Sequence, residues 1–416
     1  MNFDDTPQEA ALRRQARDWI QANAPHELRD ELANAPLFSL ELKSVDPLET
    51  AKAWQKKKQA AGWACAHWPK AYGGRDAALL ERVIWDQEEG VYGRLSQPFS
   101  IGVGMAAPTV MAYATEDQKR TLLPKIASGE EIWCQLFSEP VAGSDLAGLA
   151  TKAAPDGEGW RINGQKVWTS WAHHADWGLL LARTDPTVPK HKGLTMYFID
   201  MRQPGVEVRP IRQMNDKRVF NEVFFSDAWV PDSQRLGPVG GGWQASLTTL
   251  MNERLSASGV PTGFEQIFDL TCNLEGPDGP VVDDPAVRAK LAHWATTASG
   301  LKYTLCRTLT SLSRGETPGP ESSVGKLAAA STLQSVTHFA LDLLGEHGQL
   351  TSTAPEHGGG WFQAMAMRSP ALRIEAGSDE ILRNIIAERV LGLPGDIRVD
   401  KDVAYEAIPK RGSRLR

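Results

Sequence analysis

The spacing of apolar residues changes twice along the chain, and these changes limit the folds that it can adopt. From about Pro7 to Lys125, apolar positions recur at the three- and four-residue spacing of a helix. The next hundred or so residues favour short strands separated by loops that contain proline, and helical spacing then returns. We therefore expect an α+β multidomain fold, with a helical domain at 1–130, a β domain at 131–235 and a helical domain at 236–416.

Short-range signals predict where individual elements begin and turn. Thr6 is expected to cap a helix, with Glu9 at the third helical position completing a capping box. Asp284, which precedes a proline, marks another helix start. Asn163-Gly164 lies inside an alternating run and predicts the turn of a β-hairpin. The expected strands lie at 160–168, 179–183, 194–199 and 222–225, and the expected C-terminal helices lie at 245–255, 285–312, 325–344 and 378–391.

Composition narrows the class of protein. The chain has 416 residues, of which 23% are charged and 42% hydrophobic, and its formal net charge is −6. This balance is typical of a globular protein and gives no reason to expect nucleic-acid binding. We find no run of about 18 apolar residues and no signal-peptide pattern at the start, so we expect no membrane span. Four cysteines without metal-binding spacing indicate reduced thiols, and we expect a cytoplasmic protein.

Three segments far apart in the sequence carry the most specific information. They are Leu136-Phe137-Ser138-Glu139-Pro140-Val141-Ala142-Gly143-Ser144-Asp145-Leu146-Ala147-Gly148, then Gly164-Gln165-Lys166-Val167-Trp168-Thr169-Ser170, and Glu375-Ala376-Gly377-Ser378-Asp379-Glu380-Ile381-Leu382-Arg383-Asn384. By residue type alone they indicate a turn-rich loop, a strand with one of fourteen tryptophans, and a helix start. Together they resemble the acyl-CoA dehydrogenase family of flavoproteins, over about residues 7–395.

The resemblance implies a fold, a cofactor and partners. It implies an N-terminal helical domain, a central β-barrel-like domain and a C-terminal four-helix bundle. The implied cofactor is FAD, the implied substrate is an acyl-CoA thioester, and the implied electron acceptor is an electron-transfer flavoprotein. A homotetramer or heterotetramer would complete the FAD site across subunits. The reaction would be oxidation to a trans-2-enoyl-CoA.

The resemblance also assigns residues to the site. It places FAD against Phe137, Ser138, Trp168, Ser170, Gly345, Gly348, Ser378 and Glu380, and it places Ser144 and Arg254 at the substrate. Two segments depart from the family pattern. Asp342 and Glu346 replace a glutamine and a glycine of a segment that, in the family, approaches the FAD of a neighbouring subunit. The other departure is Leu274-Glu275-Gly276-Pro277-Asp278-Gly279, which stands where the family usually has an Arg-x-x-Phe-Gly motif that binds the flavin phosphates. We expect no metal site, because the adjacent His173-His174 pair would not face one ligand in a regular element.

The catalytic base must be argued separately. Removal of the α-proton needs a carboxylate, and many members carry it at the position of Ala376, which cannot accept a proton. Glu375 is one residue away, which turns its side chain by roughly 100° in a helical geometry. Other members use a Glu-Arg pair on an earlier helix, and here that pair is Glu253-Arg254. We expect Glu253 to be the base, with Glu375 as the alternative.

Two other functions stay open at this point. One is a partner subunit of a heteromeric dehydrogenase of the steroid side-chain type, which the altered phosphate segment and Ala376 favour. The other is a flavin-dependent monooxygenase on the same fold, which would need no base. Reaction with a panel of acyl-CoA thioesters, with the chain expressed alone, distinguishes them.

Overall fold

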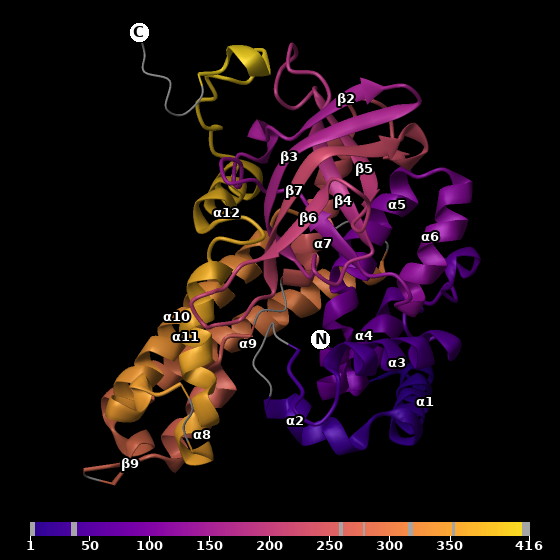
Figure 1. Cartoon of the computed structure of the whole chain (residues 1–416). Coiled ribbons are helices and arrows are strands. Elements are labelled where there is room, and N and C mark those ends of the chain that lie inside the picture. Colours follow the sequence, from indigo (N-terminus) through magenta and orange to yellow (C-terminus); the bar gives the residue numbers. More distant parts are fainter. Residues whose placement is uncertain are drawn as a thin grey trace. The chain divides into compact units, whose positions relative to one another are not determined.

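The computed structural model describes residues 5–34, 40–257, 261–277, 279–314, 319–351 and 354–409. It divides the chain into two compact units, one of residues 1–252 with 397–416 and one of residues 253–396 (Figure 1). In sequence order a helical region is followed by a β region and then by helices, as predicted. The domain limits at 130 and 235 stay predictions.

Helices make up most of the N-terminal region. They are α1 (Pro7–Asn23), α2 (Arg29–Asn34), α3 (Pro47–Ala60), α4 (Leu79–Glu89), α5 (Ala107–Tyr113) and α6 (Glu116–Ser128). Thr6 caps α1 and forms the predicted capping box with Glu9. Glu89 is 5% exposed and accepts hydrogen bonds from Trp54 Nε1 (2.8 Å) and Lys58 Nζ (2.9 Å). The buried charge is therefore paired, as a charge away from water requires.

The β region forms one mixed sheet. Its strands are β1 (Trp133–Leu136), β2 (Lys152–Asp156), β3 (Gly159–Ser170), β4 (Trp177–Arg183), β5 (Leu194–Asp200), β6 (Val206–Pro210), β7 (Phe220–Pro231) and β8 (Arg235–Leu236). They pair in the order β6-β7-β3-β2-β4-β5-β8, and β1 pairs with β4. Strands β3 and β7 lie side by side (Figure 1). Because β6 and β8 end the order without pairing to each other in the described residues, the barrel-like domain that the resemblance implies is here a single sheet that does not close.

The Asn163-Gly164 turn prediction is wrong. Strand β3 continues through both residues, and the register with β7 shifts there, between Ile162 and Gly164. The Asn163 side chain donates to Asp227 Oδ1 (2.8 Å) and accepts from the Asp227 backbone N–H (3.0 Å). A Cβ on Gly164 would lie 2.5 Å from Thr151 Oγ1. Asn163 and Gly164 therefore form a bulge between neighbouring strands. A bulge needs the same backbone freedom as a turn, which is why the same residue types occur in both.

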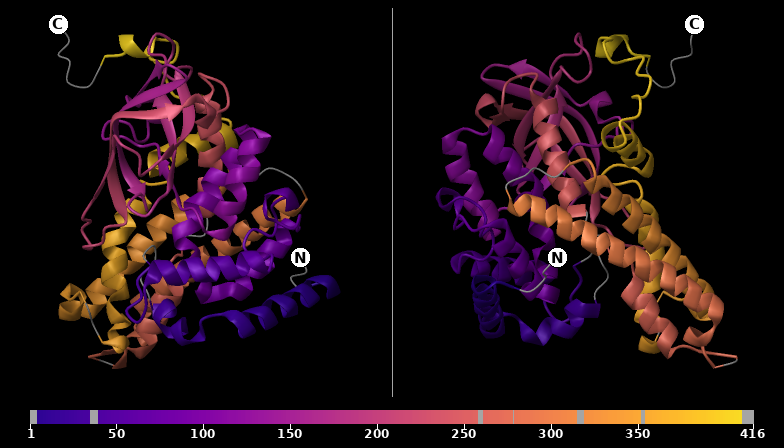
Figure 2. Two further views of the ribbon diagram at one scale, coloured as in Figure 1. Left: turned by 45° about the vertical axis from the view of Figure 1, so that its right-hand side comes forward. Right: turned by 180° about the vertical axis from the view of Figure 1, so that it is seen from behind.

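The second unit is helical apart from a short hairpin. It contains the end of α7 (Gly242–Ala257), then α8 (Phe264–Asn273), β9 (Glu275–Gly276), β10 (Gly279–Pro280), α9 (Pro285–Ser313), α10 (Ser322–Leu344), α11 (Trp361–Leu372) and α12 (Asp379–Ile385). Asp284 caps α9 by accepting a hydrogen bond from the backbone of Ala286 (2.7 Å), as expected. Helix α10 packs against α8, α9, α11 and α12, and the α9 and α10 ribbons run side by side in both views of Figure 2.

After α12 the chain returns to the first unit. Tyr405 lies with its ring 3.5 Å from the Arg183 guanidinium carbon, and its backbone N–H donates to Val188 O (2.9 Å). Lys190 Nζ contacts Asp400 Oδ2 at 2.6 Å and Asp145 Oδ1 at 2.9 Å. The segment 397–409 is thus tied to the end of β4 and to the loop after it, and Lys190 links it further to Asp145 in the loop that follows β1.

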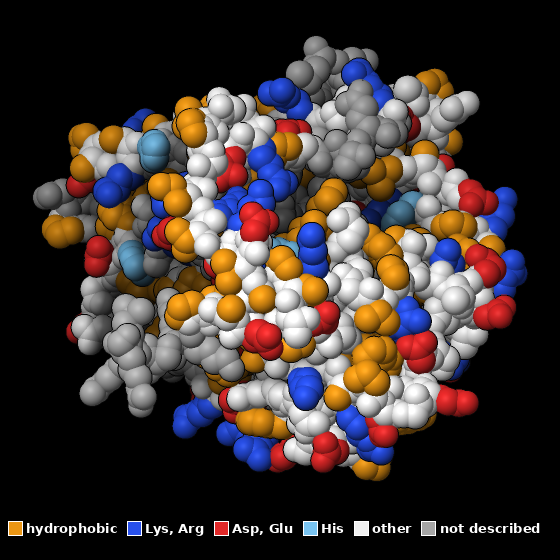
Figure 3. Space-filling view, turned by 90° about the horizontal axis from the view of Figure 1, so that it is seen from above, with side chains coloured by type: hydrophobic (Ala, Val, Ile, Leu, Met, Phe, Trp, Pro, Cys, Tyr) orange, Lys and Arg blue, Asp and Glu red, His pale blue; other side chains and the backbone are white. Residues whose placement is uncertain are grey.

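In the part of the chain that the structure describes, no helix combines the length and the apolar character needed to cross a membrane. On the face that Figure 3 presents, Lys and Arg side chains are interspersed with Asp and Glu. That face therefore carries charges of both signs rather than one basic field.

Candidate active site

The first part of the candidate site is the loop that follows β1. Glu139 and Ala142 exchange two backbone hydrogen bonds, of 2.9 and 3.0 Å, and so form a tight turn with Pro140 and Val141 at its tip. Ser138, directly before this turn, is half-buried and accepts a hydrogen bond from the Val167 backbone (2.9 Å). Two of the segments singled out in the sequence are therefore neighbours in the fold.

A buried ion pair fixes these two segments to each other. Lys166 Nζ donates to Glu139 Oε1 (2.8 Å) and to the carbonyl oxygen of Phe137 (2.9 Å). The other acceptor positions of Glu139 take the backbone N–H groups of Ala150 (2.7 Å) and Thr151 (2.9 Å). Burial alone would raise the pKa of Glu139, but Lys166 and these donors outweigh it and lower the pKa. The carboxylate thus stays ionised, and Ser138 is held between two fixed residues.

Trp168 projects from this rigid base toward solvent. It lies at a bulge between β3 and β7 and has a φ of 60°, a backbone conformation that non-glycine residues seldom adopt. Its side chain is 59% exposed, and its ring meets Phe220 edge to face at 5.9 Å. Ser170, two residues further, is half-buried. An exposed indole on a fixed bulge is a suitable surface for a planar aromatic ligand such as an isoalloxazine ring.

Two further residues of these segments differ in their exposure to solvent. Thr169, directly after Trp168, is 1% exposed, and its Oγ1 has no hydrogen-bond partner in the described structure. Ser144, predicted to face the acyl-CoA, is exposed at the surface of the loop. Thr169 therefore faces the interior, whereas Ser144 is accessible to a ligand.

The second unit contributes the segment from Glu375 to Glu380. Ala376 and Gly377 both have positive φ, of 51° and 93°, and so form a left-handed turn. Ser378 follows as the cap of α12 and accepts a hydrogen bond from the Ile381 backbone (3.4 Å). Glu380 is exposed in the first turn of this helix. Ser378 and Glu380 are thus both at the positive end of the α12 dipole.

The two candidate bases differ in their partners. Glu375 is bound by Arg368, whose Nη2 lies 2.7 Å from both carboxylate oxygens. Glu253 is half-buried near the end of α7. Burial lowers the pKa of the Lys326 ammonium, and the nearby carboxylates of Asp379, Glu375 and Glu253 oppose this effect. The second unit therefore brings Glu253 and Glu375 into electrostatic range of one lysine, and Arg368 binds both carboxylate oxygens of Glu375.

Arg254, the predicted substrate contact, has a side chain that lies outside the described part of the structure. The same holds for Asp278 in the altered phosphate segment. From Leu274 to Val287 the sequence has no lysine or arginine, and Glu275 is exposed on the short hairpin β9–β10. This segment therefore does not fit the role of a phosphate clamp.

Gly345 and Gly348 follow the end of α10. Gly345 has a φ of 53°, and a Cβ on Gly348 would lie 2.5 Å from the carbonyl oxygen of Leu341. His347, between them, stacks on His357 with ring centroids 4.2 Å apart. The glycines are thus explained by local chain geometry, and their proposed contact with FAD stays a prediction.

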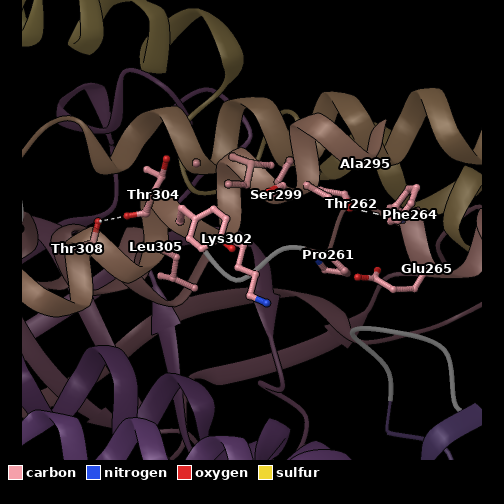
Figure 4. Close-up of a pocket in the computed structure, with 15 residues that line it drawn as sticks. Pro261, Thr262, Phe264, Glu265, Ala295, Ser299, Lys302, Thr304, Leu305 and Thr308 are labelled. Atoms are coloured by element: carbon pink, nitrogen blue, oxygen red, sulfur yellow. Dashed lines mark hydrogen bonds between the residues drawn. The ribbon is translucent and has the colours of Figure 1, made fainter. Parts of the chain in front are cut away.

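A cavity of about 540 Å³ lies among α8, α9 and α10 of the second unit (Figure 4). Small side chains of α9 and α10, including Ala295, Ser299 and Ala329, leave this space between the helices. Lys302 points from α9 into the open side of the cavity in Figure 4. No residue predicted for the site lines it.

Sequence reasoning missed the residues that hold the site in place. Lys326 is the most informative, because it is 3% exposed and donates to Gly377 O (2.7 Å). Its signal was present, since it is the one charged residue between Val324 and Ser331. A single charge in an apolar helical run indicates a buried partner.

Comparison with known proteins gives one consistent result. Residues 6–130, 134–228 and 240–391 match the models of the acyl-CoA dehydrogenase N-terminal, middle and C-terminal domains. Acyl-CoA dehydrogenase IpdE1 of Mycobacterium tuberculosis is 37% identical over 394 residues, which is 93% of this chain and 98% of that protein. Acyl-CoA dehydrogenase FadE34 of the same organism is 37% identical over 358 residues, covering 83% of this chain and 47% of that protein.

Solved structures agree with these matches. The Tcur3481-Tcur3483 steroid ACAD superposes with a TM-score of 0.78 at 27% identity, over 95% of this chain and 100% of that one. The ChsE4-ChsE5 complex of Mycobacterium tuberculosis gives a TM-score of 0.76 at 28% identity, with the same two coverages.

Proposed function

Because this chain belongs to the acyl-CoA dehydrogenase family of FAD-dependent oxidoreductases, we propose that it oxidises the α,β bond of an acyl-CoA thioester to a trans-2-enoyl-CoA. The observation that carries this proposal is the exposed Trp168 ring on a bulge that is locked beside Ser138 by the Lys166–Glu139 pair. The sites proposed for FAD are Phe137, Ser138, Trp168, Ser170, Gly345, Gly348, Ser378 and Glu380, and those for the substrate are Ser144 and Arg254.

Different residues of the chain are proposed to remove the proton and to orient the cofactor. Bound FAD supplies the two-electron oxidant that accepts the β-hydrogen as a hydride. Glu253 takes the α-proton on a carboxylate oxygen, because Ala376 has no acceptor and Glu375 is bound by Arg368. The exposed face of Trp168 orients the ring system of the cofactor, and Ser138 and Ser170 present hydroxyls next to it. An electron-transfer flavoprotein would be the acceptor of the two electrons.

A second candidate is a chain that works only with a different partner chain. Two observations favour it: the segment that replaces the phosphate motif has no basic residue, and similar solved structures include the ChsE4-ChsE5 complex. In this case the partner would supply the missing phosphate contacts, and the assembly would be a heterotetramer. The similar Tcur3481-Tcur3483 protein is a steroid ACAD, which makes bulky, ring-bearing acyl groups the first substrates to test.

Anaerobic mixing of the purified yellow protein with a panel of acyl-CoA thioesters tests both candidates. We expect at least one thioester to bleach the flavin absorbance of the chain expressed alone and to yield the enoyl product. Bleaching only after co-expression with a second dehydrogenase chain would support the heteromeric candidate. If the chain binds flavin but none of the thioesters reduces that flavin, either in the chain alone or after co-expression, both candidate functions are contradicted.

A further inference from the structure

Lys326 is a charged residue inside the helical core of the second unit. It lies on α10 between Gly325 and Leu327, and its side chain is 3% exposed. A buried ammonium is strongly unfavourable unless it finds a fixed acceptor. Its Nζ donates to the carbonyl oxygen of Gly377 at 2.7 Å. The charge is therefore used to hold one point of the backbone that lies 51 residues further along the chain.

The backbone at that point adopts an unfavourable conformation. Ala376 has a φ of 51° and Gly377 a φ of 93°, so two consecutive residues are left-handed. Glycine adopts this conformation readily, whereas alanine suffers contacts between its Cβ and the backbone. Such a turn persists only where surrounding contacts determine it. The hydrogen bond from Lys326 is a contact of this kind, and it acts on the carbonyl group directly before the cap of α12.

Two ion pairs on either side of the turn complete the support. Arg373 binds Asp379, with Nε 2.7 Å from Oδ2, and Asp379 is 2% exposed. Arg368 binds Glu375 through both carboxylate oxygens. These pairs fix the chain before and after the turn, but neither reaches the carbonyl group of Gly377. Lys326 is thus the side chain that holds the centre of the turn among the contacts described.

We propose that Lys326 is a positioning residue that holds the left-handed Ala376-Gly377 turn and thereby fixes the orientation of the N-terminus of α12, with Ser378 and Glu380, the residues that the proposed function assigns to FAD. The part of this inference that concerns the turn stands on the hydrogen bond and the backbone angles alone. The part that concerns the flavin rests on the proposed function. Lys326 touches neither cofactor nor substrate in this account; it acts through the turn.

Three variants of the full chain test the role of Lys326 in the turn. Lys326→Met removes the donor, Ala376→Gly removes the strain, and the third variant combines them. We expect Lys326→Met to lower the unfolding temperature by about 2–4 °C, because the carbonyl group of Gly377 loses its buried donor. Because the strain is present in the parent protein, Ala376→Gly should raise the unfolding temperature of the parent, and it should raise that of the Met background by a smaller amount, since the turn can relax once the donor is gone. Lys302→Met, on the exposed surface of α9, is the matched control and should have no effect.

Equal effects of Ala376→Gly in both backgrounds would overturn the inference, because the lysine and the turn would then be independent. If Lys326→Met does not fold, recovery of folding by the double variant supports the inference. If neither folds, Lys326→Arg, which keeps a donor, must fold and retain the parent unfolding temperature to within a few degrees; its failure would also overturn the inference.

Flavin content and the visible absorption spectrum separate this inference from the proposed function. We expect Lys326→Met to lose FAD at least threefold more readily than the Lys302→Met control and to shift the flavin band, with partial recovery in the double variant. If the unfolding temperatures show the coupling but the flavin content and spectrum do not change, the turn is held as proposed while the flavin lies elsewhere.

Discussion

Lys166 Nζ lies 2.8 Å from Glu139 Oε1, and the two side chains are 0% and 4% exposed. This pair joins the loop after β1 to the middle of β3, and the residues on either side of it, Ser138 and Trp168, are the ones proposed to meet the flavin. A rigid, dry connection between the two segments keeps the proposed flavin surface in one geometry. The proposed site thus depends on a pair that is itself buried away from the surface.

Breaking this pair on one side should be strongly destabilising. Glu139→Gln leaves the Lys166 ammonium buried without its counter-charge, which costs about 3–5 kcal/mol of unfolding free energy. Glu139→Gln combined with Lys166→Met removes both charges, keeps an acceptor for the backbone N–H groups of Ala150 and Thr151, and should recover most of the loss. The guanidinium chloride midpoints of unfolding measure the effect. A single variant as stable as the parent protein would show that the pair does not fix the segments.

Trp168 should matter for the cofactor and little for stability. Because its side chain is 59% exposed, Trp168→Ala removes few packing contacts. The loss of an aromatic contact should weaken FAD binding roughly three- to tenfold. Equilibrium dialysis of FAD measures the change. Trp229→Ala, at a 38% exposed tryptophan of β7, is the matched control, and an equal loss of FAD in both variants would contradict the proposed role of Trp168.

The buried imidazole of His67 should make the stability of the folded chain depend on pH. Burial, helped by the charge of Arg82, lowers its pKa from 6.5 to about 4, and its Nδ1 is buried without a hydrogen-bond partner. The unfolded chain therefore binds a proton between pH 6.5 and 4 that the folded chain does not, so stability falls as the pH drops through this window. His67→Gln should flatten this loss by up to about 3 kcal/mol. Unfolding measured at pH 7 and pH 4.5 for both proteins checks it; parallel losses would rule out His67 as the cause.

The return of the chain to the first unit should depend on Tyr405. Its ring lies against Arg183, and such a cation–π contact contributes about 0.5–2 kcal/mol. Tyr405→Ala should therefore release the segment 397–409 and speed tryptic cleavage at the exposed Lys401 several-fold. Asp402→Asn, an exposed change in the same segment, serves as the control. Cleavage at unchanged rate in Tyr405→Ala would show that other contacts hold the segment.

Local signals in the sequence predicted elements well where one residue determines the geometry. Thr6 and Asp284 cap helices as predicted, because a side-chain acceptor beside free N–H groups works without tertiary context. The order of helical and β regions and the family resemblance are also confirmed. Asn163-Gly164 failed because the same backbone freedom serves a turn or a bulge, and only the position of β7 decides between them.

The supports of the site could not be predicted in the same way. Lys166 and Glu139 lie 27 residues apart, and Lys326 and Gly377 lie 51 apart. The local sequence pattern does not predict that these groups meet. A lone charge in an apolar run indicates that a partner exists but not which residue it is. The resemblance supplied candidate contacts with the ligand, while the hydrogen bonds that fix those contacts are visible only in the fold.

The rate of flavin reduction in Glu253→Gln tests the central claim most directly. The change keeps the shape of the side chain and removes the proton acceptor, so anaerobic stopped-flow reduction by a bleaching acyl-CoA should slow by roughly 10²–10⁴-fold while FAD stays bound. Glu375→Gln, whose carboxylate is already held by Arg368, should slow it far less. If Glu375→Gln shows the large loss and Glu253→Gln reduces flavin at the parent rate, the assignment of Glu253 as the base is wrong.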